Sequence, residues 1–145
     1  MKDNEDSLYE LQQLQKNSKM EKHLEFAQGV INRMGQNSFL IKGWAVTLVS
    51  ALFALAAKDT DPRFVSIAFF PVVVFWLLDS YYLYQERLFR KVYDHVRLQL
   101  IVDYSLSTQN FDKGFPDWAK AAFSKTIVSF YGIIILSLII VMAFI

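Results

Sequence analysis

Cysteine is missing from this 145-residue sequence, and glycine and proline are scarce, with five and three copies. Without cysteine, the chain can form neither a disulfide framework nor a zinc ribbon, and it has no catalytic thiol. Hydrophobic residues make up 54% of the chain. This content excludes an intrinsically disordered protein, because so much apolar surface can offset the entropy lost on folding. The length suits a single small domain.

Charge is also missing, but only locally. The stretches 43–57, 64–78 and 126–145 hold no charged side chain, so all 29 charged residues fall in the other 95 positions. The last stretch has twenty residues, enough for a helix to cross the hydrocarbon core of a bilayer, which is about 30 Å thick. Each shorter stretch fits either a membrane span or a core helix of a soluble bundle.

Two features favour the membrane for the shorter stretches. A polar turn of six residues, 58–63, separates them, as in a membrane hairpin. Aromatic residues gather near their ends, as in the interfacial belts of membrane proteins. These aromatic residues are Phe39, Trp44, Tyr81, Tyr82 and Tyr84.

We therefore expect an all-α membrane protein with three transmembrane helices, an N-terminal amphipathic helix and a cytosolic extension of the second span. The sequence predicts two regions, a cytosolic N-terminal helical region and a three-span membrane domain that includes a cytosolic helix and loop. Their expected bounds are 1–38 for the first region and 39–145 for the second, with spans at about 39–57, 64–84 and 126–145 and the cytosolic helix and loop at 85–125.

The distribution of Lys and Arg predicts the orientation. Residues 1–42 hold six of them, the turn at 58–63 holds two, and residues 79–125 hold seven. Because cytoplasmic flanks carry the positive excess, both large polar regions are expected in the cytoplasm, and the turn and the C-terminus on the outer face. The first 38 residues are too polar for the apolar core of a signal peptide, so we expect a retained N-terminus. The expected location is a bacterial plasma (inner) membrane.

The pattern before the first span is helical. Residues 1–18 have few apolar positions and predict a marginal helix, whereas Leu24, Ala27, Ile31 and Met34 recur at helical spacing. This stripe fits packing on a neighbouring helix, and it also fits contact with the bilayer or with another protomer.

The second span is expected to continue as a helix to about Ile101, because neither Gly nor Pro interrupts residues 72–113. Residues 105–116 have the composition of a loop. After it, Asp117 is expected to cap a short helix in which Trp118 and Phe123 lie at the membrane interface.

Lys42 and Asp79 are charged residues within the predicted spans. Lys42 lies 15 residues before Ala57 and Asp79 lies 15 residues after Phe64, so the two side chains are expected at the same depth. An ionised group in the membrane core costs at least about 2.5 kcal/mol, which predicts an ion pair between them. Its role is open: a gate or ion path, a lock on helix register, or two separate interfacial charges.

The first span carries a small-residue face, five residues that fall within about 80° of arc on a helix. These residues are Gly43, Thr47, Ser50, Ala54 and Ala57. Small residues let helices approach closely in lipid, either within one protomer or between copies. In a homo-oligomer, Thr47 and Ser50 would face a narrow polar lumen. Pro71 would kink the second span and could act as a hinge.

The predicted cytosolic helix carries a basic face, formed by Arg87, Arg90, Lys91 and Arg97. Arginine can donate two hydrogen bonds to one phosphate, which fits a nucleotide or oligonucleotide ligand. Juxtamembrane basic clusters also follow from topology and from anionic headgroups, so both readings stand.

Signals of catalysis are few. His23 and His95 are the only histidines, too few for a convincing metal site, and neither a G-x-S-x-G elbow nor a glycine-rich phosphate loop occurs. We expect a protein that is not an enzyme and needs no cofactor.

Two stretches, HLEFAQGVINRMGQNSFLIKGWAVTLVSALFALAAKD and FPVVVFWLLDSYYLYQERLFRKVYDHVR, resemble a family of small, uncharacterised bacterial membrane proteins. The resemblance covers roughly residues 20–100 and brings no catalytic motif. The architecture also resembles short membrane effectors of antiphage defence systems such as Hailong, in which an oligonucleotide controls a membrane channel.

Two functions follow as expectations. The first is an oligomeric channel or pore-type effector of antiphage defence, which depolarises the membrane under control of a cytosolic ligand. The second is a non-conducting membrane anchor or scaffold that recruits a soluble partner protein encoded nearby. Both would place the chain in the lipid bilayer, and the first requires a homo-oligomer, because three spans cannot enclose a useful pore.

Overall fold

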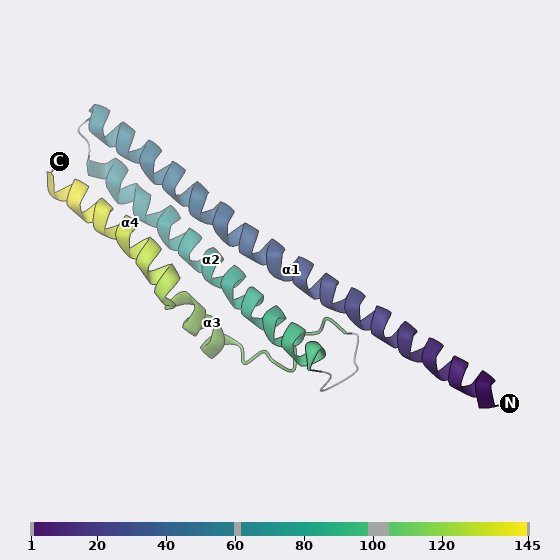
Figure 1. Cartoon of the computed structure of the whole chain (residues 1–145). Coiled ribbons are helices and arrows are strands. Elements are labelled where there is room, and N and C mark those ends of the chain that lie inside the picture. The colour runs from purple at the N-terminus through teal and green to yellow at the C-terminus, as the bar shows by residue number, and fades with distance from the viewer. Residues whose placement is uncertain (1, 60–61, 99–104, 145) are drawn as a thin grey trace. The chain divides into compact units, whose positions relative to one another are not determined.

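The computed structural model describes residues 2–59, 62–98 and 105–144, and in these ranges it contains four helices and no strand (Figure 1). The helices are α1 (Lys2–Asp59), α2 (Pro62–Arg97), α3 (Phe115–Ala122) and α4 (Lys125–Phe144). By length and composition, α1, α2 and α4 could each cross a membrane. The all-helical fold and its three candidate spans are confirmed, while insertion and orientation stay predictions.

α1 is a single helix of 58 residues. It passes through Asn37 and Ser38 without interruption, and it already includes the weakly patterned residues before position 19. No Pro and only three Gly occur within it, so nothing in its sequence breaks the backbone ladder. The amphipathic segment and the first candidate span are therefore one element.

α2 continues through Pro71 and beyond the apolar stretch as far as Arg97. Leu98 N donates a last helical hydrogen bond to Asp94 O at 3.1 Å. The predicted extension is thus confirmed up to Arg97, and its expected last residues, to Ile101, lie outside the described part of the chain.

The predicted start of the short helix at Asp117 is wrong. α3 begins at Phe115, its N-cap is Gly114 with φ of 68°, and Asp117 N donates to Gly114 O at 3.2 Å. Pro116 favours this earlier start, since proline is well suited to the first helical turn. Asp117 therefore lies in the first turn and not at the cap, and the loop ends at residue 114.

Contacts within the chain form two compact units, and α1 and α2 contribute to both. The first unit comprises Met1–Asn32 and Arg87–Asp112, and the second comprises Arg33–Glu86 and Lys113–Ile145. The sequence predicts one boundary, at residue 38 in α1. The two units group the N-terminal segment with the end of α2, and the predicted region bounds stay a prediction.

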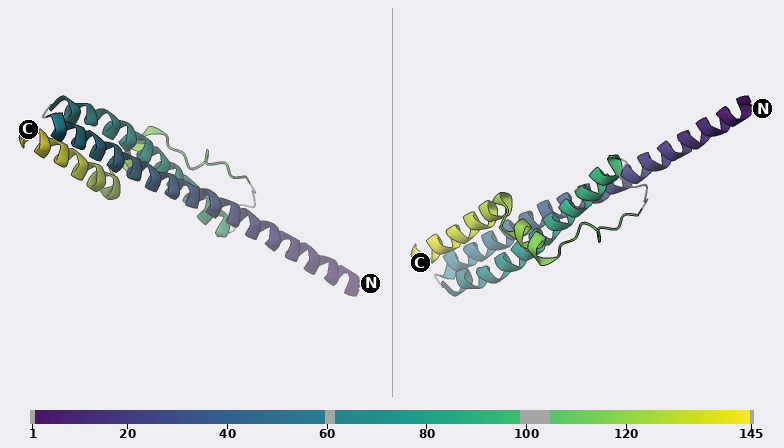
Figure 2. Two further views of the ribbon diagram at one scale, coloured as in Figure 1. Left: turned by 90° about the horizontal axis from the view of Figure 1, so that it is seen from above. Right: turned by 90° about the horizontal axis from the view of Figure 1, so that it is seen from below.

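In the first unit, α1 and the end of α2 run side by side (Figure 2). Ala27 and Ile31 of α1 are buried, as are Leu88 and Val92 of α2. The packing interpretation of the N-terminal stripe is confirmed for Ala27 and Ile31.

In the second unit, three helices share an apolar core. Val72, Tyr131 and Leu138 are among its most deeply buried side chains. α1 contributes Ala45, Val49 and Ala56, α2 contributes Val65, Ala68 and Val72, and α4 contributes Ile127, Tyr131, Ile134 and Leu138.

Candidate functional site

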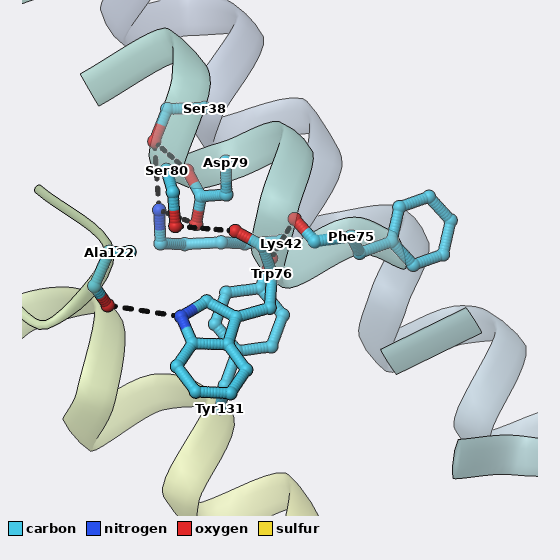
Figure 3. A network of polar contacts seen from close by, with 8 residues as sticks. All are labelled: Ser38, Lys42, Phe75, Trp76, Asp79, Ser80, Ala122 and Tyr131. Atoms are coloured by element: carbon cyan, nitrogen blue, oxygen red, sulfur yellow. Dashed lines mark hydrogen bonds and ion pairs between the residues drawn. The ribbon is translucent and has the colours of Figure 1, made fainter. Parts of the chain in front are cut away.

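Ser38, Lys42 and Asp79 form a polar cluster between α1 and α2 (Figure 3). Lys42 Nζ lies 2.6 Å from Asp79 Oδ2. Ser38 Oγ donates to Asp79 Oδ1 at 2.5 Å and accepts a hydrogen bond from Lys42 Nζ at 2.8 Å. Each member of the polar cluster thus contacts both of the others, and the predicted Lys42–Asp79 ion pair is confirmed.

The polar cluster is buried unevenly. The Asp79 side chain is fully buried, whereas the Lys42 side chain is 19% exposed. Burial of a carboxylate is costly unless a cation and hydrogen bonds replace the lost solvent contacts. Asp79 has both, from Lys42 and from Ser38, and Lys42 keeps a partial exit to the surface.

Ser38 is the member that the sequence analysis missed. It lies one helical turn before Lys42 on α1, and this spacing places both side chains on one face of the helix. That spacing was the available signal. Ser38 supplies a second partner for the carboxylate. Oδ1 of Asp79 contacts Ser38, and Oδ2 contacts Lys42.

Hydrogen bonds from side chains to main-chain carbonyls surround the polar cluster on α2. Ser80 Oγ donates to Trp76 O at 2.6 Å, and Tyr131 OH donates to Phe75 O at 3.1 Å. Trp76 Nε1 donates to Ala122 O at 3.0 Å. The bond from Ser80 lies within α2, whereas the bonds of Tyr131 and Trp76 tie α2 to α4 and α3 (Figure 3).

The small-residue face of α1 is turned away from the core of the second unit. All five of its residues are exposed, whereas Ala45 and Val49 of the same helix are buried. Thr47 Oγ1 donates to Gly43 O at 2.9 Å, so its hydroxyl proton is satisfied within the helix. The alternative that this face packs within one protomer is therefore wrong.

The basic face lies on α2 in the first unit. Arg90, Lys91 and Arg97 are exposed and Arg87 is half-buried, opposite the buried Leu88 and its neighbours. Arg97 Nη2 lies 3.5 Å from Asp94 Oδ1, and both side chains are more than half exposed. The basic face is therefore largely accessible, and its ligand stays a prediction.

The two histidines have different surroundings. His23 is buried in the first unit, and His95 packs edge-to-face on Phe111, with ring centroids 5.4 Å apart. Among the described residues, no group of three or more potential ligands is placed to hold a metal ion.

Among the described residues of the second unit, Asp79 of the polar cluster is the buried charged side chain, and the small-residue face begins directly after Lys42 on α1. Their function has to be argued from geometry and charge. Comparison with known proteins adds no assignment: no protein family, curated protein or solved structure matches this chain.

Proposed function

We propose that this chain is an integral membrane protein that assembles into a homo-oligomeric ion channel. The observation that carries the proposal is the exposure of the whole small-residue face, including Thr47 and Ser50, on a helix long and apolar enough to span a bilayer. Exposed small residues in a membrane helix allow the close approach of another helix, and hydroxyl groups on the same face can line a polar path.

The filled core explains why the path would lie between copies. Val72, Tyr131 and Leu138 are buried at the centre of the second unit. An ion moving through one protomer would have to displace these side chains, at a cost comparable to that of opening a large cavity. A path between copies of α1 displaces none of them.

The polar cluster gives such a channel a charged group at the start of the path. Lys42 precedes Gly43 directly in α1 and is the partly exposed member of the ion pair. When it pairs with Asp79, its charge is neutralised within the protomer. Separation of the pair would place an ammonium group beside the path, so the ion pair is proposed as the gate.

The resemblance to antiphage effectors suggests where the channel acts and what opens it. The channel would lie in a bacterial inner membrane, and it would depolarise that membrane when a nucleotide ligand reaches Arg87, Arg90, Lys91 and Arg97. Exposed arginines on one helix side support an anionic ligand, since their planar groups pair with phosphates.

Potassium flux from proteoliposomes tests the channel. We expect flux with the natural protein and a loss of flux in Thr47→Leu/Ser50→Leu. The larger leucine side chains would narrow the path and exclude water from it. The matched control is Thr126→Leu/Ser129→Leu, an exposed pair on α4 with the same residue types and spacing. Flux should survive in the control.

Crosslinking of the same samples tests the assembly. We expect a ladder of oligomers for the natural protein and for both leucine pairs. A ladder limited to the monomer, or equal flux from the two leucine pairs, would contradict the proposed path.

One observation favours the anchor as a second candidate. Leu8, Leu11 and Leu14 of α1 are each more than half exposed, and all residues from 6 to 19 are exposed. Such a segment suits the docking of a soluble partner. An anchor predicts no flux, and it predicts that Leu8→Ser/Leu11→Ser/Leu14→Ser abolishes co-purification of that partner.

A further inference from the structure

α3 and its flanks present an aromatic–lysine surface in the second unit. Phe115 and Phe123 are 74% and 69% exposed, and the ring of Trp118 lies 5.6 Å from that of Phe115. Three exposed lysines accompany these rings. The surface comprises Lys113, Phe115, Trp118, Lys120, Phe123 and Lys125.

One side of α3, which includes part of Trp118 and Phe123, is fixed to the bundle. Ala121 and Ala122 are buried, and Trp76 Nε1 of α2 donates to Ala122 O at 3.0 Å. The rings of Trp76 and Phe123 meet edge-to-face, with centroids 5.7 Å apart. The aromatic–lysine surface therefore has a defined orientation and is not part of a loose loop.

Its place in the chain fixes its depth in a membrane. Lys125 is the first residue of α4, and the residues that follow to the end of that helix carry no charge. If α4 spans the bilayer, α3 lies at the level of the headgroups, since only a short turn separates the two helices. Phe and Trp side chains are stabilised at that level.

The charge of the surface is positive. The stretch holds three lysines, Lys113, Lys120 and Lys125, and one carboxylate, Asp117, whose Oδ1 lies 3.2 Å from Lys120 Nζ. The stretch 113–125 thus has a net charge of +2. Lys113 and Lys125 supply the excess, and basic side chains at this depth attract anionic lipids.

We propose that the aromatic–lysine surface binds anionic phospholipids, with the lysines on the phosphate groups and the aromatic rings among the upper acyl carbons. The proposal rests on the membrane insertion of the proposed function but not on channel activity. Charge complementarity favours lipid over a second copy of this chain, because the same surface on a second copy would bring lysines against lysines.

Quenching of Trp118 fluorescence by brominated lipids tests the proposal on the full chain in vesicles. The Trp118 signal is the difference between the natural protein and Trp118→Phe. We expect stronger quenching by brominated phosphatidylglycerol than by brominated phosphatidylcholine at equal content. In Lys113→Gln/Lys125→Gln the preference should fall by about fivefold for each lysine at low ionic strength.

The matched control is Lys16→Gln/Lys19→Gln, two exposed lysines of the first unit, which should keep the preference. Equal quenching by the two lipids would overturn the proposed selectivity for anionic lipid. If neither lipid quenches Trp118, protein covers the surface, and lipid binding itself is overturned.

Alkaline extraction separates this inference from the proposed function. If the natural protein stays in the vesicles without a lipid preference, only the lipid surface is wrong. If it is extracted from the vesicles, both proposals are overturned.

Discussion

Replacing Lys42 with methionine would leave the fully buried Asp79 carboxylate without its cation. Removal of one partner of a buried pair typically costs about 3–5 kcal/mol, because the remaining charge is neither solvated nor paired. Ser38 would still donate to Asp79 Oδ1. We therefore expect the lower end of that range, about 3 kcal/mol, for the loss of unfolding free energy in Lys42→Met.

The reverse change should cost less. In Asp79→Asn, the Lys42 side chain is already 19% exposed and can extend its ammonium group toward the surface. What is lost is a charge-assisted contact, worth about 1.5 kcal/mol. The double variant Lys42→Met/Asp79→Asn removes both charges and should be more stable than Lys42→Met alone.

Denaturation in mixed detergent micelles measures these differences, with Lys58→Met as the control. Lys58 is exposed, so its replacement should change the free energy of unfolding by less than about 0.5 kcal/mol. Reversing both charges, Lys42→Asp/Asp79→Lys, should also restore expression that either single reversal lowers. Equal stability of Lys42→Met and Lys58→Met, or no rescue by the double reversal, would refute the reasoning.

Changes at three further positions test the contacts that hold α3 and α4 in the second unit. Trp76→Phe removes the hydrogen-bond donor to α3, worth about 1 kcal/mol, and should speed tryptic cleavage after the exposed Lys120. Gly114→Ala places a side chain at φ of 68° and should lower the unfolding free energy by about 1–3 kcal/mol, although no atom lies within 4 Å of the added carbon. Tyr131→Phe should cost about 1 kcal/mol by removing the bond to Phe75 O, and Tyr131→Ala about 3–5 kcal/mol in calorimetry.

The ion pair could be predicted from the sequence because membrane depth can be counted in residues. Lys42 and Asp79 lie equally far from the turn that joins their helices, and a lone charge at that depth is costly. The same argument cannot find Ser38, because an uncharged hydroxyl carries no such penalty. Its contact with Asp79 follows only from its position one turn before Lys42, on the helix face that the ion pair turns toward α2.

Contacts that end on the main chain could not be predicted at all. Trp76 and Tyr131 both donate to carbonyl groups, which every residue has, so no residue type marks the acceptor. The start of α3 was misplaced for a related reason. Asp117 is a common capping residue, but the positive φ of Gly114 and the ring of Pro116 begin the helix two residues earlier.

The orientation of the small-residue face was also left open by the sequence. Gly43 and Thr47 gain little by burial, whereas Ala45 and Val49, on the opposite side of α1, belong to the apolar core of the second unit. Which side of α1 is buried depends on how it packs against the other helices. The sequence of α1 alone does not show this packing.

The middle of α2 is held less by its own backbone than the rest of that helix. Pro71 has no N–H to donate to Ile67 O, and the carbonyls of Phe75 and Trp76 are each engaged by a hydroxyl group as well. This stretch therefore depends on α4 and on Ser80 for part of its cohesion. Its amide protons would exchange with solvent as one cooperative group when α4 separates from it, so their exchange rate reports how often the bundle opens.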